Sequence, residues 1–251
     1  NKMITIKEAL TKKEMKDYVM FSFELYKNNP YWIPPIIAEE LETFDKTKNP
    51  ALQTAEAHFY LAYKDNKIVG KIAAIINWEE VNLLGKRKAR FGWFDAIDDV
   101  EVTKALLDKV EELGRKHNMD HMEGPMGFSN LDKVGILSEG FDQMGNMITW
   151  YSLPYYITHF EQLGFIKEKE YIESDFSFNG INPEPFQKAS ELIKKRYELR
   201  SLNFTKTKDI MPYVDKMFDL FNETYAKLQS FVPINDIQKE YFKKKYIGFI
   251  N

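Results

Sequence analysis

The sequence predicts an α/β (α+β) protein in which helices flank a mixed, mostly antiparallel sheet, followed by the start of a second, similar copy. Three patterns lead to this fold class. They are a hairpin over residues 59–76, an amphipathic helix over 98–116, and an order of strand, helix, break and helix over 3–44 that recurs over 199–246. The 251 residues are 44% apolar and 29% charged, which is enough to build a sizeable core.

The first predicted elements are a short strand at Met3–Lys7 and a helix that begins at Thr11. Glu14 follows three residues after Thr11, as in a capping box, and apolar residues then recur at helical spacing. The paired prolines of Trp32–Pro35 exclude regular structure there, because each proline fixes φ and lacks an amide donor. A second short helix is predicted near Ala38–Phe44.

A hairpin and a third strand form the predicted centre of the sheet. Phe59–Tyr63 and the β-branched segment Ile68–Ile76 flank the turn Asp65–Asn66. Phe91–Phe94 is a third strand with bulky aromatic side chains. The basic run 86–90 is interpreted as a solvated hairpin tip; the alternative is that it folds over a bound cofactor and contacts its phosphates.

The most regular helix is predicted to begin at Asp98, with Glu101 at the capping-box position. Its apolar face is continuous, and it ends near Lys116, where basic side chains suit the negative end of the helix dipole. A short strand at Asp120–Glu123 follows, and Gly124–Pro125 ends it.

The second part of the chain contains further predicted elements, which are a helix at Tyr155–Leu163, a strand at Tyr171–Phe178, a connector helix at Glu184–Arg196, a strand at Leu199–Phe204, and helices at Asp209–Leu228 and Asp236–Tyr246. We therefore divide the chain into a first domain over 1–180, a connector helix within 181–198, and a partial second domain over 199–251. The second copy stops at Asn251, where a hairpin is expected, so we expect a fragment or a half-domain that packs onto the first.

Composition narrows the expected partners and location. The 35 basic and 38 acidic residues give a net charge of −3, so no global field attracts nucleic acid. The chain has no cysteine, which excludes disulfides, thiolate catalysis and cysteine-bound metals. The longest aliphatic run, Ile72–Ile76, is much shorter than the roughly 20 residues of a membrane span, and the first residues carry no apolar signal region. We expect a cytoplasmic protein with no membrane partner.

Several segments in order point to a family. The hairpin Phe59–Gly70, the helix Val100–Lys116, the segment Phe160–Phe165 and the strand Tyr171–Phe178 resemble the GNAT superfamily of acyl-CoA N-acyltransferases. Phe160–Phe165 is similar to that family's Tyr-Glu-Lys-Leu-Gly-Phe signature. Other segments, including Trp32–Pro35, resemble an uncharacterised bacterial subfamily of double GNAT-like proteins. The resemblance implies acetyl-CoA or another acyl-CoA as co-substrate, an amine as acceptor, and no metal.

The resemblance places the cofactor site at the loop Asp95–Glu101, which precedes the cofactor helix. In the family, the pyrophosphate lies on a Gly-rich loop at this helix start, where free amides and the helix dipole attract anions. Here the loop has no glycine, no basic residue and four carboxylates, which repel phosphate. We predict that coenzyme A binds this copy weakly or not at all. The candidate cofactor-binding residues are Phe94, Ala96, Ile97, Ser129 and Asn130.

The candidate catalytic residues are Tyr156 and Glu123. The signature tyrosine, which protonates the departing thiolate in many family members, aligns with Phe160, and phenylalanine donates no proton. Tyr156 lies one turn earlier on the same helix face and is the candidate substitute; the alternative is a half-buried packing residue. Glu123, next to the backbone that would orient the amine, is the candidate base.

Two further groups of residues are candidates. His117 and His121 have a metal-like spacing, but the segment spans a helix end and a strand start, which favours surface histidines. The chain has a surplus of aromatic residues, namely Tyr31–Trp32, Phe91, Trp93, Phe94, Trp150–Tyr151 and Tyr155–Tyr156, and most of them are expected in the core. The segment Trp150–Tyr156 is a loop before a helix, however, and loop aromatics commonly line a ligand cleft. Ser129 and Asn130 lie near the predicted break, so we place the ligand site between these segments, with turn chemistry as the alternative.

Three hypotheses of function follow. The first is an acyltransferase that moves an acyl group from coenzyme A to a small-molecule or peptide amine. The second is a non-catalytic GNAT-like domain that serves as a scaffold, binds a small ligand or forms a homodimer, with any activity in the missing part of the second copy. The third is aminoacyl transfer from a charged tRNA, which the lack of a large basic surface disfavours.

Overall fold

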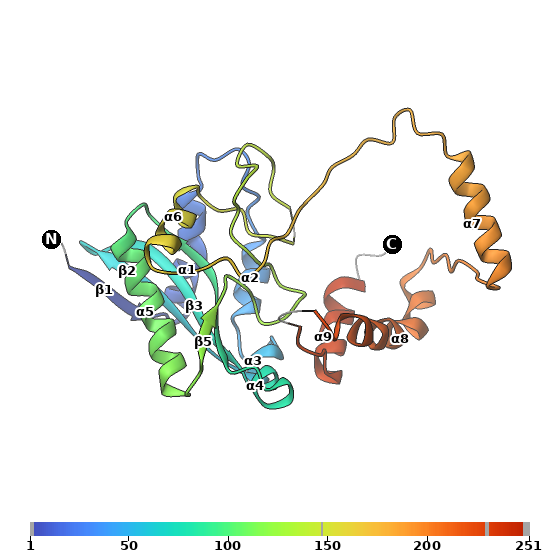
Figure 1. Cartoon of the computed structure of the whole chain (residues 1–251). Coiled ribbons are helices and arrows are strands. Elements are labelled where there is room, and N and C mark those ends of the chain that lie inside the picture. Colours follow the sequence, from blue (N-terminus) through green and yellow to red (C-terminus); the bar gives the residue numbers. More distant parts are fainter. Residues whose placement is uncertain (1–2, 147, 229–230, 248–251) are drawn as a thin grey trace.

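The computed structural model describes residues 3–146, 148–228 and 231–247, so the predictions that fall on Asn1 and Asn251 lie outside the described residues. The elements in chain order are β1 (Ile4–Glu8), α1 (Lys12–Leu25), α2 (Ile37–Thr43), α3 (Ala51–Thr54), β2 (Ala55–Lys64), β3 (Lys67–Asn77), α4 (Trp78–Leu84), β4 (Lys88–Ala96), α5 (Val100–Lys116), β5 (His121–Glu123), α6 (Tyr155–Gln162), α7 (Glu184–Arg196), α8 (Thr207–Tyr225) and α9 (Asp236–Tyr246). The first eleven form a packed body, from which α7 stands apart (Figure 1).

The sheet has the strand order β1-β2-β3-β4-β5. The first four strands pair antiparallel, whereas β5 pairs parallel with β4 over Lys88–Arg90 alone. Beyond Arg90, β5 no longer pairs with β4, so other segments of the chain cover that edge of the strand. This is the mixed, mostly antiparallel sheet flanked by helices that the sequence predicted.

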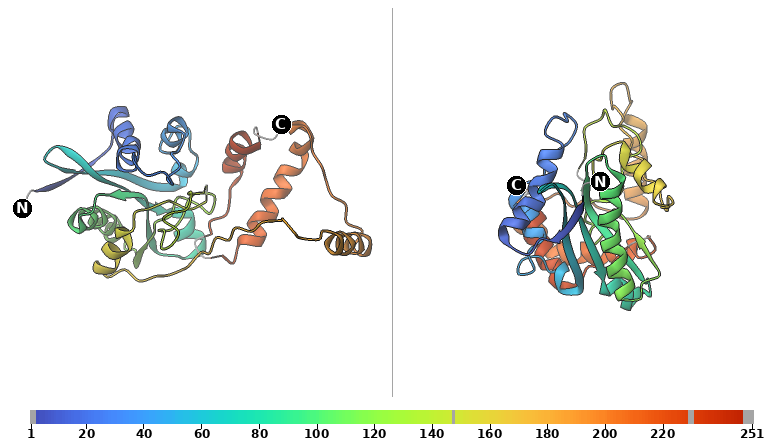
Figure 2. Two further views of the ribbon diagram at one scale, coloured as in Figure 1. Left: turned by 90° about the horizontal axis from the view of Figure 1, so that it is seen from above. Right: turned by 90° about the vertical axis from the view of Figure 1, so that its left-hand side faces the viewer.

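Each face of the sheet is covered by a layer of helices, with α1 and α2 on one side and α5 and α6 on the other (Figure 2). On the α1 side the core contains Tyr18, Phe44, Phe59 and Trp93. On the α5 side, residues from β3 and β4 pack against the apolar face of α5. Alternation along the strands builds both cores, because successive side chains point to opposite faces.

Local signals in the sequence were confirmed at α1 and at the hairpin turn. The Thr11 side chain accepts from the Glu14 amide, and the Glu14 carboxylate accepts from the Thr11 amide. Asp65 and Asn66 both have positive φ, at 50° and 60°, as a two-residue hairpin turn requires. The N-cap of α5 differs from the prediction: Asp99, not Asp98, accepts from the Glu101 amide.

The interpretation of residues 86–90 as a solvated tip was wrong. Helix α4, which the sequence analysis missed, presents Glu80 to Lys88 and Arg90, and all three side chains are buried. Glu80 lies 3.1 Å from Lys88 and 2.8 Å from Arg90, and Arg90 also donates to the carbonyl of Gly127. Because a buried charge is tolerated only when it is paired, these residues fasten α4 and the following loop to β4.

Two predicted strands are not formed. Residues 171–178 and 199–204 are irregular and largely exposed, and neither pairs with any strand among residues 3–146, 148–228 and 231–247. Alternating polarity creates a strand only where a neighbouring strand supplies hydrogen bonds. The connector helix and the two later helices do form; α8 and α9 share a small core of Val214, Phe218, Ile234, Phe242 and Ile247.

Among the described residues, no helix is both long enough and apolar enough to cross a membrane. The longest of them, α8, is amphipathic and carries an internal proline at Pro212.

Candidate functional site

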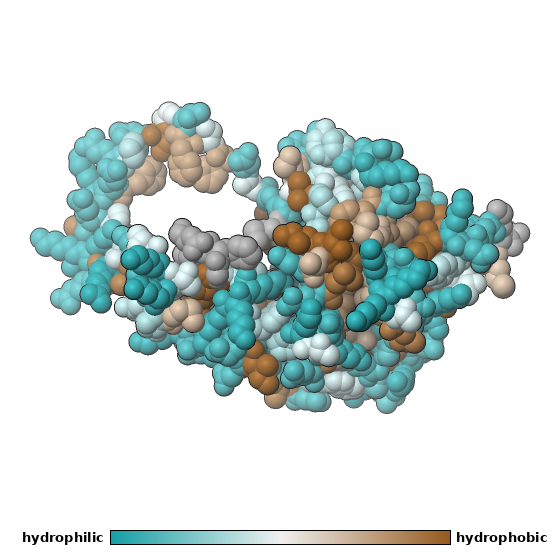
Figure 3. All heavy atoms as spheres, turned by 180° about the vertical axis from the view of Figure 1, so that it is seen from behind, coloured by the Kyte–Doolittle hydropathy of each residue, from teal (hydrophilic) through white to brown (hydrophobic). Residues whose placement is uncertain are grey.

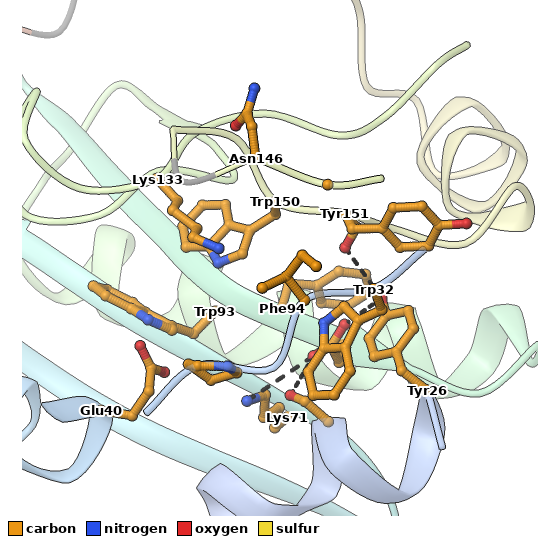
Figure 4. Close-up of a pocket in the computed structure, with 15 residues that line it drawn as sticks. Tyr26, Trp32, Glu40, Lys71, Trp93, Phe94, Lys133, Asn146, Trp150 and Tyr151 are labelled. Carbon is orange, nitrogen blue, oxygen red and sulfur yellow. Dashed lines mark hydrogen bonds and ion pairs between the residues drawn. The ribbon is translucent and has the colours of Figure 1, made fainter. Parts of the chain in front are cut away.

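A pocket opens on the α1 side of the sheet, at the end of β4 (Figure 4). Its cavity has a volume of about 50 Å³, which admits a small polar head group and not a long chain. Three of the four tryptophans of the chain line it. The residues that line it are Ser22, Tyr26, Trp32, Ile33, Pro35, Glu40, Lys71, Trp93, Phe94, Asp95, Lys133, Gly145, Asn146, Trp150 and Tyr151.

A bulge in β4 aims two of these side chains into the pocket. Lys71 pairs with Asp95 and Ala73 pairs with Gly92, so three steps along β4 oppose two along β3. Trp93 takes up the extra residue with a φ of 45°, a costly conformation for a tryptophan. Because the bulge reverses the alternation, Trp93 and Asp95 face α1, whereas Phe91 packs on the α5 side.

Asp95 joins three elements through its carboxylate. Ser22 of α1 and Tyr26, which caps the C-terminus of α1, donate to it at 2.6 and 2.8 Å, and Tyr156 of α6 donates at 2.9 Å. The Lys71 ammonium lies 3.9 Å away and also sits over the Tyr18 ring. Four partners for a single buried carboxylate indicate that Asp95 is held rigidly in place.

Glu40 and Lys133 bring two further charges to the pocket. Among the described residues the Glu40 carboxylate forms no hydrogen bond and no ion pair within 4 Å. Burial raises the pKa of Glu40 above its usual range, although Lys71 and Lys133 oppose this shift. Burial likewise lowers the pKa of both Lys71 and Lys133. The pocket therefore holds a carboxylate that can accept a proton close to two cations.

The start of α5 has a different character, because several of the backbone amides around it are already bonded within the chain. The amides of Glu101 and Val102 donate to the side chain and the carbonyl of Asp99, and the Ile97 amide donates to Val69. The Asp99 carboxylate also accepts from Lys64 at 2.8 Å, which lowers its pKa. A helix start whose amides are satisfied in this way offers little to a phosphate.

Two tyrosines of α6 close the edge of β4 next to that helix start. The Ala96 amide donates to the Tyr156 hydroxyl at 3.0 Å, and the Tyr155 hydroxyl donates to the Ala96 carbonyl at 2.6 Å. Further down the strand, the Met126 amide donates to the Phe91 carbonyl. A Cβ on Gly92 would approach the Met126 carbonyl oxygen to 2.2 Å, so the chain itself fills the space beside β4.

The structure does not bring the five candidate cofactor-binding residues together. Phe94 lines the pocket, and Ala96 and Ile97 form the closed helix start described above. Ser129 lies in a separate, smaller cavity beneath α9, and Asn130 is exposed. Their role in binding a cofactor remains a prediction.

The two candidate catalytic residues lie at opposite ends of β4. Tyr156 contacts Asp95, while Glu123 pairs with Arg90 in the sheet register and with Lys88 through its side chain. Five residues along a strand span roughly 16 Å, so the two do not act on one substrate atom. Burial raises the pKa of Tyr156 well above its usual range, which disfavours proton donation to a thiolate.

The histidines of the predicted metal-like motif each contact an acid. His117 lies 2.8 Å from Glu56, and His121, which is exposed, lies 4.0 Å from Glu123. Within the described part of the chain, no group of three or more His, Cys, Asp or Glu side chains is arranged to hold a metal ion.

The aromatic residues that line the pocket stood out in the sequence, although most of that group was expected in the core, whereas the charged residues of the pocket were not predicted. Trp32, Trp93 and Trp150 belong to this aromatic group. Lys71 could have been identified from the sequence, since a lone charge inside an apolar strand indicates a buried functional or paired group. Glu40 could not have been identified in this way, because it lies in a short polar helix among other glutamates.

Comparison with curated proteins finds two relatives, and no family model matches the chain. Protein YghO of Escherichia coli K12 is 29% identical over 203 residues, which cover 79% of this chain and 51% of the relative. Bacterial ceramide synthase of Caulobacter vibrioides is 26% identical over 189 residues, which cover 75% of this chain and 49% of the relative. The chain spans about half the length of the curated relatives it matches.

Comparison with solved structures finds remote likenesses. A predicted acetyltransferase from Clostridium acetobutylicum, solved with acetyl-CoA, matches 69% of this chain and 96% of its own, with 13% identity and a TM-score of 0.41. A tandem GNAT protein from the clavulanic acid biosynthesis pathway matches 47% of this chain and 34% of its own, with 14% identity and a TM-score of 0.37. These likenesses are too remote to assign a function. The element order, the antiparallel β1–β4 sheet and the short parallel β4–β5 pair nevertheless give residues 4–162 the mixed, mostly antiparallel sheet flanked by helices that the sequence predicted.

Proposed function

We propose that this chain takes part in N-acyl transfer from an acyl-CoA to an amine, and that the pocket over β4 holds the amine. The observation that carries the proposal is the Glu40 carboxylate, which has no hydrogen-bond partner among the described residues and stands in a pocket walled by Trp32, Trp93 and Trp150. Aromatic faces and a carboxylate are the groups that attract an ammonium ion.

Glu40 is suited to remove the proton that keeps an amine from attacking. Its raised pKa brings it closer to neutral pH, where a general base is most effective. Once the amine is neutral, its nitrogen attacks the thioester carbonyl, the C–N bond forms and the C–S bond breaks. The second proton of the nitrogen goes to the departing thiolate. Lys133 and Lys71 are placed to stabilise the negative oxygen of the tetrahedral intermediate.

The name of one relative agrees with an amide-forming reaction. The Caulobacter protein is a bacterial ceramide synthase, and a ceramide is a lipid that contains an amide bond. An amine with a small polar head and a long apolar tail would place the head alone in the 50 Å³ pocket.

The closed start of α5 supports a second candidate, in which residues 4–162 bind an amine ligand without catalysing transfer. In that case the acyl-CoA is held elsewhere or not used at all. The amides of Ala96, Ile97 and Glu101, which lie within the loop where the resemblance places the cofactor, are bonded within the chain. This observation also agrees with the sequence-based expectation that coenzyme A binds here weakly or not at all.

The test separates ligand binding from chemistry. Tryptophan fluorescence reports on the pocket, since only Trp78 lies outside it. Octylamine should quench it, octanol and octanoate should not, and Glu40→Gln should weaken amine binding about tenfold. Glu39→Gln, a change of the neighbouring exposed carboxylate, is the matched control.

The chemical step is followed by thiol release from acyl-CoA in the presence of the amine. The transferase proposal predicts that Glu40→Gln lowers kcat about 10²- to 10⁴-fold, while Glu39→Gln leaves it unchanged. Amine binding without thiol release would favour the non-catalytic candidate. The absence of amine binding to the wild type would refute both.

A further inference from the structure

Helix α7 and the segment that follows it make an isolated surface. In α7 no residue is buried, and Figure 3 shows this part of the chain separated from the main body by an open gap. Phe186 and Ile193 are 68% and 49% exposed, and Tyr197, just beyond the helix, is 61% exposed. Side chains of this kind are rarely left in water without a partner.

These apolar side chains share one face of α7. Phe186 and Ile193 are seven residues apart, or about two turns, and Tyr197 follows one turn later. Lys188 and Lys195 are also seven residues apart and lie on the opposite side of the helix. The helix is therefore amphipathic although it packs against nothing in the described part of the chain.

The charge of this surface is opposite to that of the whole protein. Residues 184–208 contain seven Lys or Arg and three Asp or Glu, a net charge of +4, whereas the complete chain carries −3. Lys188 is paired with Glu184 on the helix, but Lys194 and Lys195 form no ion pair among the described residues. Leu199 and Leu202 continue the exposed apolar set beyond the helix.

We propose that residues 184–208 bind the surface of an anionic lipid bilayer, with α7 lying in the plane of the interface. A basic amphipathic helix binds in this way because its apolar face enters the acyl boundary while its cations meet anionic head groups. The proposal revises the expectation of no membrane partner. It does not depend on acyl transfer, although it would bring a lipid amine within reach of the chain.

The 13 residues of α7 give a helix roughly 20 Å long, which is too short to span a bilayer but long enough to lie on one. Its last turn carries Lys194, Lys195 and Arg196, and these three side chains are the natural target for a charge test. Neutral glutamine is the suitable replacement, because it keeps the helix propensity of the segment.

The test is co-sedimentation of the whole chain with phosphatidylcholine vesicles that contain 30% phosphatidylglycerol, and with pure phosphatidylcholine vesicles. Binding is expected only to the anionic vesicles, and it should weaken at 0.5 M salt. Each neutralised cation should cost up to roughly fivefold in affinity, so the triple variant Lys194→Gln, Lys195→Gln, Arg196→Gln should bind more than tenfold more weakly. The variant Phe186→Ser, Ile193→Ser tests the apolar face and should also lose at least tenfold.

The matched control is Lys12→Gln, Lys13→Gln, Lys16→Gln, which removes the same charge from an exposed face of α1. This control should bind vesicles like the wild type. No binding to anionic vesicles, or an equal loss in the control, would overturn the proposal. A dimer in solution that Phe186→Ser, Ile193→Ser dissociates, with no vesicle binding, would assign the surface to a second copy of the chain instead.

Discussion

The end of β4 carries two neighbouring regions of opposite character. On the α1 side, Glu40 stands in a pocket with no hydrogen-bond partner among the described residues. At the start of α5, the amides of Ala96, Ile97 and Glu101 are all bonded within the chain. One strand can therefore border an open pocket with an unpartnered carboxylate on one side and, at its end, a helix start whose nearby amides are already occupied.

The closed region is held by hydrogen bonds as well as by charge. Four carboxylates in Asp95–Glu101 predicted that a phosphate would be repelled. The structure pairs three of them, because Asp95 lies 3.9 Å from Lys71, Asp99 contacts Lys64, and Asp98 contacts His159 at 3.0 Å. The start of α5 is therefore closed to a phosphate because its nearby amides are occupied. Neutralising one of the carboxylates would not free these amides.

Asp95 links the two regions, and its removal should have the largest effect on stability. Asp95→Ala leaves Lys71 buried without its anion and removes the acceptor of three hydroxyl groups. The free energy of unfolding, measured in urea, should fall by about 3–5 kcal/mol. Asp108→Ala, which removes an exposed partner of Lys104, should cost less than about 1 kcal/mol. Equal losses in the two variants would show that Asp95 has no special role.

Tyr156→Phe should have the next largest effect. The change removes the hydroxyl that donates to Asp95 and accepts from the Ala96 amide, and we expect a loss of about 1–3 kcal/mol. Tyr171→Phe, in an exposed segment, should be neutral.

The same variant tests the predicted role of Tyr156 as an acid. If Tyr156 donates a proton in the reaction, Tyr156→Phe should lower kcat by about 10²- to 10⁴-fold and leave the stability of the fold unchanged. We expect instead a loss of stability with a smaller change in kcat, because the raised pKa of Tyr156 favours a role in holding Asp95. A large fall in kcat at full stability would restore the acid role.

Asp99→Asn should have the smallest effect, and one that depends on pH. Asparagine still caps α5, so only the charge pair with Lys64 is lost, at about 0.5–1 kcal/mol. The Lys64 hydrogen bond lowers the pKa of Asp99 in the folded protein, so its stabilising contribution is present above about pH 4 and disappears as the pH falls further. Urea unfolding should show a difference in the free energy of unfolding between the wild type and Asp99→Asn at pH 7, and this difference should shrink at pH 3. A difference that persists at pH 3 would contradict this origin.

Much of the fold could be predicted from the sequence because local signals decide it. The capping box at Thr11 and the turn Asp65–Asn66 each depend on residues a few positions apart. The strand predicted at Tyr171–Phe178 failed because pairing depends on a neighbouring strand, which no local pattern reveals. The buried pair of Glu80 with Arg90 was missed for the same reason.

The residues of the candidate site were likewise predictable only in part. Its tryptophans were identified as an aromatic surplus, and Lys71 was visible as a charge in an apolar strand. Glu40 meets them only through the packing of α2 on the sheet, and Trp93 enters only through a one-residue bulge. Neither the packing nor the bulge follows from residue spacing.

Calorimetric titration of coenzyme A into the wild-type chain and into Asp99→Asn tests the comparison most directly. Closure by hydrogen bonds predicts that both proteins bind coenzyme A equally weakly, with a Kd no lower than millimolar, since removing one charge leaves the amides occupied; the thiol-release assay then needs acyl-CoA at similarly high concentration. Micromolar binding by the wild type would contradict it.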